Sequence, residues 1–332
     1  MIDRVHSSGN KNILILSAGR RVELIESFKN AAVKYKDRFD CRILAADMNP
    51  KLSSACYIAD AAFSLPHSNE VSFISELIQL CNAEKVSLVV PTNDNELLVL
   101  AKNTSQLESA GVTPIISSLS FVEKCRDKRL SGVLFKEMGI KYPKIFDREE
   151  ISYPCFCKPY NGSSSIGAFK IQDESELTEE VKNNPQNMFM ELIPENYSEY
   201  TVDMYFDRNS SIKCIIPRER IATRAGEVSK GITRKNFVYE LLQKNVNSIW
   251  GAVGCVTVQV FGDPVSKKVV GLEVNPRFGG GYPLSVASGA DYADFLIREY
   301  LLDEELPWYE DWQDNTLMLR YDAKVIVKNA SI

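Results

Sequence analysis

The first third of the chain alternates between short apolar runs and amphipathic segments, and this alternation restricts the fold more than any other feature. NILILSAG is followed by the helix-like RRVELIESFKNAAVKY, CRILAADMNP by VSFISELIQLCNAEK, and VSLVVPTND by NELLVLAKNTSQLESAG, before VTPIISS adds a short fourth strand. Strands joined by helices through short links form a parallel sheet that is covered on both faces. Residues 1–118 are therefore predicted to form a Rossmann-like domain.

The first strand-to-helix turn of this domain, SAGRRVEL, lacks the GxGxxG pattern of dinucleotide-binding domains. Its one glycine is explained by the need for a tight turn. Ligands of open parallel sheets nevertheless bind at the carboxyl ends of the strands. The turns at 17–21 and 91–96 are therefore candidates for part of a substrate pocket.

The pattern changes near residue 118. SLSFVEKCRDKRLSGVLFKEMG predicts two short helices, with Asp127 as the N-cap of the second and Gly139 at its end. PCFCKPYNGSSSIGAFKI predicts a strand, a loop and a strand, and several alternating strands follow. We expect a small lid-like module at 119–187 and a larger antiparallel α+β domain at 188–332. The predicted fold class is thus α/β plus α+β.

Composition and charge exclude several classes of protein. The 332 residues are 45% apolar and 25% charged, as in globular proteins, and the net charge of -5 argues against a nucleic-acid partner. No stretch approaches the roughly 20 apolar residues of a membrane span, and the polar start MIDRVHSSGNK does not resemble a signal peptide. We therefore expect no membrane partner and a cytoplasmic location.

The rare residue types restrict the chemistry. The two histidines, His6 and His67, lie near no recognisable serine or cysteine nucleophile, which argues against Ser/His and Cys/His catalysis. The eight cysteines include no CxxC pair, so buried thiols are expected rather than disulfides or a zinc site. Any metal would need oxygen ligands, which favours Mg²⁺.

A glycine- and serine-rich loop at 161–167 follows Lys158, which ends an apolar strand. Its backbone N–H groups could cover phosphates while Lys158 supplies a positive charge, although a flexible hairpin with a surface lysine is the alternative. Lys128 is expected in the first turn of its helix, where the helix dipole disfavours a cation and a bound anion would relieve the conflict.

The segment ELIPENYSEYTVD combines a strand end with a proline. Glu191 to Ile193 precede Pro194, so their backbone groups are expected to be free of a sheet ladder and available to an adenine ring. Glu199 could accept hydrogen bonds from ribose hydroxyls. An edge strand with a solvated acid explains the same residues.

The stretch VVGLEVNPRFGGGYPLS places polar side chains on an apolar strand. The turn sequence GDPVSKK predicts that VTVQVF and VVGLEV pair as a hairpin, which brings Gln259 opposite residues 271–273. Glu273 and Asn275 lie two positions apart, so their side chains point to the same face of the hairpin as that of Gln259. Three oxygen-bearing side chains in one place favour Mg²⁺ with phosphates, and Arg277 could clamp the same phosphates.

In this order, the motifs resemble those of the ATP-grasp superfamily, and within it the carbamoyl-phosphate-synthetase-like carboxylate–amine ligases. The resemblance spans nearly the whole chain and rests on DK at 127–128, CKP with its glycine loop, MELIPENYSEYTVD, VTVQVFGD and LEVNPRFGGGYPLSVASGADY. It implies an ATP-grasp fold, in which a Rossmann-like domain precedes two α+β subdomains that clamp ATP. It also implies one or two Mg²⁺ ions, for which Mn²⁺ can substitute.

The resemblance also implies roles for individual residues. ATP would be held by Lys128, Lys158, Ser163, Ser164, Ser165, Glu191, Leu192, Ile193 and Glu199, and magnesium by Gln259, Glu273 and Asn275. Many relatives have Asp or Glu at the position of Gln259, so one of two metal sites is expected to be weaker. The catalytic set would be Arg277, Lys158, Arg220 and Arg224, and the substrate set Gly279, Gly280, Gly281, Arg218 and Lys230. A solvated basic loop is the alternative for 216–236.

The implied activity is an ADP-forming ligation of a small-molecule carboxylate and an amine through an acyl phosphate. Two alternatives stay open: a carbamoyl-phosphate-synthetase-like enzyme or split subunit acting on bicarbonate and ammonia, and a non-catalytic ATP-binding subunit. A homodimer is a possible assembly. The sequence identifies neither substrate.

Overall fold

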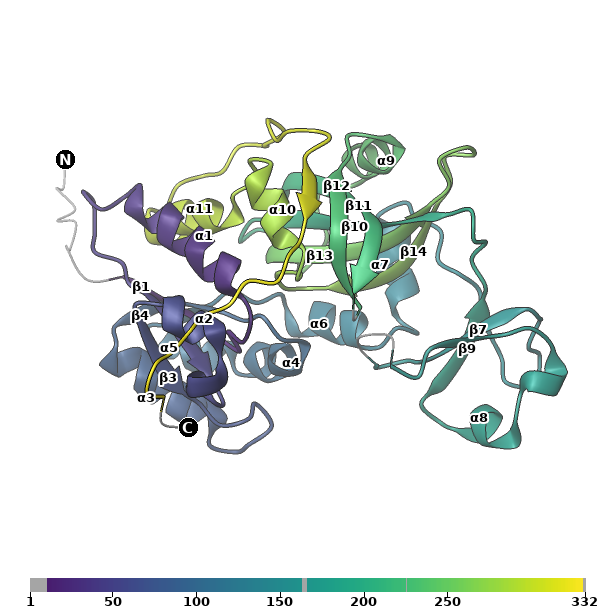
Figure 1. The fold of residues 1–332 in the computed structure, drawn as a ribbon, viewed down its shortest axis with the longest axis horizontal. Helices are drawn as coiled ribbons and strands as arrows, with labels where there is room; N and C mark the ends of the chain where they lie inside the picture. Colours follow the sequence, from purple (N-terminus) through teal and green to yellow (C-terminus); the bar gives the residue numbers. More distant parts are fainter. Residues whose placement is uncertain (1–10, 163–165, 225, 331–332) are drawn as a thin grey trace.

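The computed structural model describes residues 11–162, 166–224 and 226–330, and Figure 1 shows three units in this part of the chain. The first is a five-stranded parallel sheet of order β3-β2-β1-β4-β5. Its strands are β1 (Asn12–Ile15), β2 (Ile43–Asp47), β3 (Ala61–Ser64), β4 (Val86–Val90) and β5 (Thr113–Pro114). Its helices are α1 (Val22–Val33), η1 (Pro50–Leu52), α2 (Ser54–Ile58), α3 (Phe73–Ala83), α4 (Asp94–Lys102) and α5 (Thr104–Ser109).

Both faces of this sheet are buried, which confirms the predicted Rossmann-like arrangement. Ile13 and Ile15 of β1 pack with Phe28 of α1, whereas Leu14 packs on the other face with Leu77 of α3. The strand β3 was not predicted. It lies at the edge of the sheet, and its alternating partly exposed residues give only a weak apolar signal.

Two short helices follow, α6 (Leu119–Arg126) and α7 (Ser131–Glu137), as predicted. Asp127 is not the N-cap of α7, which begins four residues later without a side-chain cap. Asp127 instead accepts a hydrogen bond from the backbone N–H of Arg129 at 3.0 Å, because a separate turn links the two helices. Gly139 follows α7 with φ of 69°, a left-handed conformation that suits glycine at a helix end.

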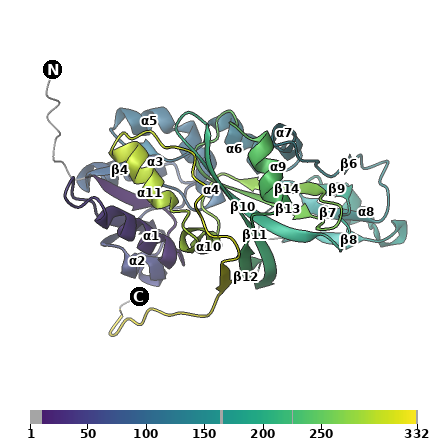
Figure 2. The same ribbon diagram turned by 90° about the horizontal axis from the view of Figure 1, so that it is seen from above.

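The second unit is a small antiparallel sheet of order β6-β9-β7-β8, which projects away from the rest in both views (Figures 1 and 2). It contains β6 (Ile145–Phe146), β7 (Cys155–Pro159), β8 (Phe169–Ile171), β9 (Asn187–Glu191), η2 (Glu174–Glu176) and α8 (Glu179–Asn183). Its core contains Cys155, Cys157 and Phe189, and these cysteines are free thiols. The expected boundary at 187 falls at the start of β9, which belongs to this sheet.

The third unit is a six-stranded antiparallel sheet of order β14-β13-β10-β11-β12-β15. Its strands are β10 (Ser198–Phe206), β11 (Ile212–Arg224), β12 (Glu227–Thr233), β13 (Gly254–Gly262), β14 (Val269–Asn275) and β15 (Leu317–Leu319). Its helical elements are α9 (Phe237–Asn245), α10 (Tyr282–Ala287), α11 (Tyr292–Leu296) and the π-helical turn η3 (Ile297–Leu301).

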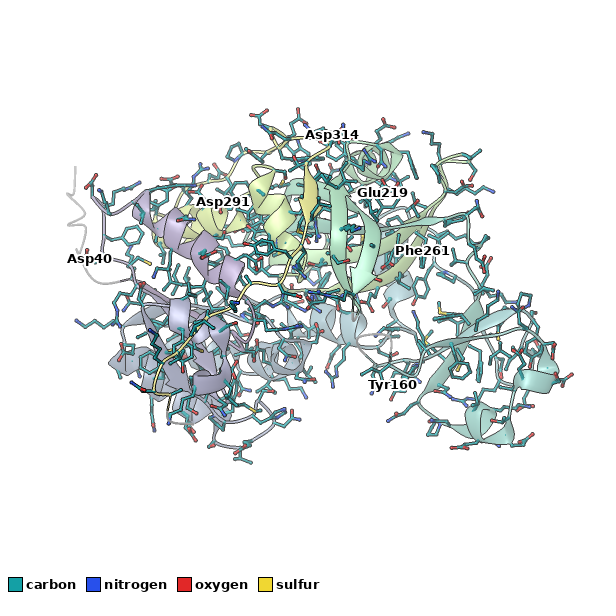
Figure 3. All side chains as sticks on the ribbon, in the orientation of Figure 1. Asp40, Tyr160, Glu219, Phe261, Asp291 and Asp314 are labelled. Carbon is teal, nitrogen blue, oxygen red and sulfur yellow. The ribbon has the colours of Figure 1, made fainter. Side chains whose placement is uncertain are left out.

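The first and third units pack directly against each other. Helix α1 contacts α10 and α11 (Figure 1). Lys34, which follows α1, forms ion pairs of 3.0 Å with Asp291 and 3.1 Å with Asp294. Asp291 also caps α11 through the N–H of Asp294, and Figure 3 labels it at this junction. No helix in the described residues is long and apolar enough to cross a membrane.

Candidate functional site

A cavity of about 460 Å³ lies where the three units meet. Most of the polar residues proposed from the sequence line it, although they come from segments far apart in the chain. From the first two units and the helices that link them, it is lined by Arg21, Lys128, Lys158, Gly162, Met190, Glu191, Leu192 and Ile193. From the third unit it is lined by Glu199, Thr201, Arg218, Arg220, Glu227, Gln259, Gly271, Glu273, Arg277, Gly279, Gly280 and Gly281.

Two lysines face Glu273 in this cavity. Lys158 lies on β7 and is buried, and this burial, together with the nearby charge of Lys128, lowers its pKa to about 8 despite the opposing effect of Glu273. Lys128 Nζ donates to the carbonyl of Gly162 at 2.5 Å and lies 3.7 Å from Glu273. Positive charges at the base of the 161–167 loop can hold phosphates. Ser163, Ser164 and Ser165 lie outside the described residues.

The position of Lys128 differs from the prediction. It lies in the turn between α6 and α7 rather than in the first turn of α7. Its backbone N–H donates to the carbonyl of Tyr160 at 2.9 Å, and the neighbouring Arg129 stacks over the Tyr160 ring at 3.9 Å. Figure 3 labels Tyr160 beside the small sheet. These contacts fix the turn to the loop of the small sheet. Lys128 therefore reaches the cavity from a turn and not from the first turn of a helix.

The segment after β9 forms another wall. Glu191 ends β9 and its side chain points to Lys141 at 3.4 Å, while Leu192 and Ile193 line the cavity between the sheets. Within the described residues, neither Leu192 nor Ile193 has a backbone hydrogen bond outside the sheet ladders. Free backbone groups beside the apolar Met190 and Phe261 can form hydrogen bonds with the edge of an adenine ring. Glu199 pairs with Arg220 at 2.8 Å, and burial raises the pKa of Glu199.

The hairpin β13–β14 has the predicted register. Gln259 lies directly opposite Glu273, and Thr257 lies opposite Asn275. Gln259 Nε2 donates to Glu273 Oε1 at 2.6 Å, and Asn275 Nδ2 donates to the same oxygen at 3.1 Å. No group of three His, Cys, Asp or Glu in the described ranges could hold a metal. The cluster of one carboxylate and two amides nevertheless fits an oxygen-ligated Mg²⁺ once the amide oxygens turn toward the ion.

Arg277 is held in place by a residue that the sequence did not single out. Its Nε and Nη2 donate to the two carboxylate oxygens of Asp94 at 3.0 and 2.8 Å. Asp94 begins α4, and the preceding Asn93 forms a capping box with Glu96 that fixes this helix start. The turn at 91–96 was a candidate for the pocket, and its N-x-x-E capping pattern is the signal that could have located Asp94.

Only some of the site residues predicted on the basic strand β11 line the cavity. Arg218 and Arg220 line it, whereas Arg224 forms an exposed ion pair with Asp322. The strand has register shifts between Arg220 and Thr223, so Thr223 faces the cavity and Arg224 faces away. Lys230 is exposed on β12 opposite Ala222 and does not line the cavity. The structure therefore does not bring Arg224 and Lys230 to the site.

The three glycines after Arg277 leave room that side chains would fill. A Cβ at Gly279 would lie 3.1 Å from Thr257, and one at Gly280 would lie 3.1 Å from Glu227. A Cβ at Gly281 would overlap the guanidinium of Arg218. These glycines allow backbone N–H groups to approach a ligand closely.

A second cavity of about 310 Å³ lies at the carboxyl ends of the strands in the first unit. Ser17, Asp47 and Asn93 line it, together with the buried Glu96. Burial raises the pKa of Glu96 to about 7, although the hydroxyl of Ser17 donates to it at 2.7 Å. The turns at 17–21 and 91–96 therefore border both cavities, because Arg21 lines the larger one and Asp94 binds Arg277 there.

Two family models match parts of the chain. The model of the PylC-like N-terminal domain matches residues 13–115, and the model described as ATP-grasp in the biosynthetic pathway with Ter operon matches residues 183–320. A curated relative, the 3-methyl-D-ornithine–L-lysine ligase of Methanosarcina acetivorans, is 29% identical over 140 residues, which cover 42% of this chain and 36% of the relative.

Solved structures resemble the fold over most of its length. A biotin carboxylase–β,γ-ATP complex from Campylobacter jejuni has a TM-score of 0.70 at 16% identity, covering 92% of this chain and 74% of that one. Rhizobium etli pyruvate carboxylase has a TM-score of 0.69 at 16% identity, covering 93% of this chain. This chain spans 30% of that carboxylase and 36% of the curated ligase. At such identities the structural likeness concerns the fold.

Proposed function

We propose that this chain, which belongs to the ATP-grasp superfamily, is an ADP-forming ligase that joins a small-molecule carboxylate to an amine. The predicted ATP-grasp fold is confirmed by the family models and by the likeness to the Campylobacter jejuni biotin carboxylase. The proposal rests on the larger cavity, which is lined by Lys128, Lys158, Glu273 and Arg277. Phosphate-binding cations, a candidate metal cluster and a fixed guanidinium at one place are the parts that phosphoryl transfer needs.

The expected roles follow the positions of these residues. The backbone after β9 would hold adenine and Glu199 the ribose, while Lys128 and Lys158 would neutralise the phosphates. Gln259, Glu273 and Asn275 would hold Mg²⁺, which supplies charge stabilisation to the phosphates when it is bound. The number of ions, and whether Mn²⁺ replaces Mg²⁺, belong to this proposal.

Arg277 would stabilise the phosphoryl group as it transfers to the substrate carboxylate. Its bidentate contact with Asp94 fixes the guanidinium at the glycine segment 279–281, where the carboxylate can approach backbone N–H groups. The carboxylate oxygen attacks the γ-phosphorus and ADP leaves, which gives an acyl phosphate. The amine then attacks the acyl carbon, and inorganic phosphate leaves with the formation of a carbon–nitrogen bond.

The test is a screen for ADP release with carboxylic acids paired with amines in the presence of Mg²⁺. We expect ADP to form only when an acid is present, and Arg277→Ala to lower turnover by roughly 10²- to 10³-fold while ATP still binds. Arg224→Ala is the matched control, because Arg224 faces away from the cavity and its loss should leave turnover unchanged. Unchanged ADP release in Arg277→Ala would refute the role of Arg277.

Two alternatives make different predictions in the same screen. ADP formation with bicarbonate and ammonia, in the absence of any organic acid, would favour a carbamoyl-phosphate-synthetase-like activity. Tight ATP binding without ADP formation from any pair would favour an ATP-binding subunit. The intact set of Lys128, Lys158, Glu273 and Arg277 favours catalysis over that second alternative.

A further inference from the structure

Arg218 carries hydrogen-bond donors that the described protein residues do not satisfy. Its side chain is only 1% exposed and lines the larger cavity. Its Nη2 lies 2.9 Å from Asp203, but its Nε and Nη1 are buried and have no partner in the described part of the chain. A guanidinium stays charged in proteins, and leaving its buried donors unmatched is costly. These donors therefore indicate a place for an anionic ligand.

Asp203 fixes one side of the Arg218 guanidinium, and a glycine packs against the other. Asp203 is itself held by the hydroxyls of Thr257 at 3.1 Å and Ser285 at 2.6 Å. On the opposite side lies Gly281, where any Cβ would overlap Nη1. The glycine thus lets Arg218 reach the end of the cavity at which residues 279–281 lie.

Arg21 lines the same cavity from the first unit, within reach of the charge of Glu227, which lies beside Gly280. It ends the turn at 17–21, and within the described residues its side chain makes one long hydrogen bond, 3.4 Å from Nη2 to the carbonyl of Thr92. Burial, and then the charge of Arg277, lower the pKa of Arg21. The nearby acids already have partners, because Asp94 binds Arg277 and Glu227 pairs with Arg320 at 3.0 Å.

The two arginines therefore add positive charge beyond what the reacting groups need. We propose that Arg21 and Arg218 bind a second, non-reacting carboxylate, so that one of the two substrates is a dicarboxylic acid or an amino acid. This inference rests on the proposed function, which assigns the reacting carboxylate to Arg277 and the glycines. Guanidinium groups suit the role because they bind carboxylates through paired hydrogen bonds.

The experiment compares substrates that carry the extra carboxylate with analogues in which it is an amide. Dicarboxylic acids and their monoamides are paired with methylamine, and monocarboxylic acids are paired with amino acids and with amino acid amides. We expect amidation to raise KM by roughly 10- to 100-fold in one of the two series, which identifies the substrate that carries the group. Equal use of free and amidated substrates in both series would overturn the inference.

Variants separate the proposed contact from a structural effect. Arg21→Gln should raise KM for the free carboxylate by the same factor, with kcat and KM for ATP little changed, and should cause no further loss with the amide. Arg20→Gln is the matched control, since Arg20 is 87% exposed and does not line the cavity. Arg218→Lys keeps the charge opposite Asp203 and should show an intermediate loss. Equal losses for free and amidated substrates in Arg21→Gln would contradict the inference.

A binding measurement tests the second carboxylate site even if the protein has no ligase activity. If no pair yields ADP, the proposed ligase activity fails, and the inference is then decided by binding. We expect succinate or glutamate, added with Mg²⁺ and ADP, to raise the melting temperature of the unaltered protein more than that of Arg21→Gln. The diamides should have no effect. Equal shifts in both proteins, or no shift at all, would overturn the inference.

Discussion

Lys158 is buried, and we propose that it binds the phosphates of ATP. Its lowered pKa, about 8, arises mainly because burial disfavours the charged ammonium, and Glu273 opposes that effect. The protein without nucleotide therefore holds Lys158 charged below about pH 8 and increasingly neutral above it. Phosphates bind the charged form, so binding above this pH requires the uptake of a proton.

We predict that ATP affinity falls as pH rises through about 8, because the fraction of protonated Lys158 then decreases. Lys158→Arg should flatten the profile between about pH 7 and 9, because the reference pKa of an arginine side chain is roughly 12 or more and the charge is then kept. Lys158→Met should bind weakly throughout. Titration calorimetry across this range provides the measurement, and a profile in Lys158→Arg that matches the unaltered protein would rule out Lys158 as the titrating group.

At the scale of elements, the hairpin β13–β14 and helix α7 depend on one glycine. A Cβ at Gly271 of β14 would overlap the ring of Phe135 on α7, and Phe135 is fully buried. Gly271 also lines the cavity. The helix therefore packs against the strand that carries Glu273 and Asn275 at a distance that only glycine permits.

Gly271→Ala should lower the free energy of unfolding by about 1–3 kcal/mol, because the ring or the strand must move. Denaturant unfolding checks this, with Val265→Ala as a control at a side chain that is 88% exposed in the turn of the same hairpin. Phe135→Leu should partly restore stability when combined with Gly271→Ala. A loss of the same size in Gly271→Ala and Val265→Ala would show that the contact is unimportant.

Local sequence patterns predicted the structural features that depend only on residues near one another in the chain. The hairpin register followed from the turn between β13 and β14, and Gln259 lies opposite Glu273 as predicted. The register shifts of β11 have no such signal, because they depend on pairing with β12, and they turn Arg224 away from the cavity. Lys128 was predicted to contact the phosphates and does line the cavity, but the turn that places it there was not predicted.

At the scale of the whole molecule, the first and third units share the cavity. Asp94 lies at the start of α4 and Arg277 follows β14, so their bidentate contact joins the two units at the proposed reacting centre. This ion pair joins residues that are 183 positions apart, and no local pattern in the sequence indicates it. Arg21 likewise reaches the cavity only because the first unit packs against the third.

Asp94→Asn should lower kcat on the order of 10- to 100-fold, because the amide no longer fixes both nitrogens of Arg277. ATP affinity should change little, since Asp94 lies outside the proposed nucleotide contacts. Steady-state kinetics with calorimetry of ATP binding would test both expectations. The neighbouring Asn95→Ala serves as a control that lies on the smaller cavity. Equal kcat values for Asp94→Asn and Asn95→Ala would contradict the positioning role.

We propose that ATP activates a carboxylate as an acyl phosphate in the larger cavity. The most direct test of this proposal uses a substrate acid labelled with ¹⁸O in both carboxylate oxygens, once the screen has identified the pair. Mass spectrometry should then find one labelled oxygen in the inorganic phosphate for each carbon–nitrogen bond formed. Phosphate without label, or label recovered in AMP, would contradict the proposal.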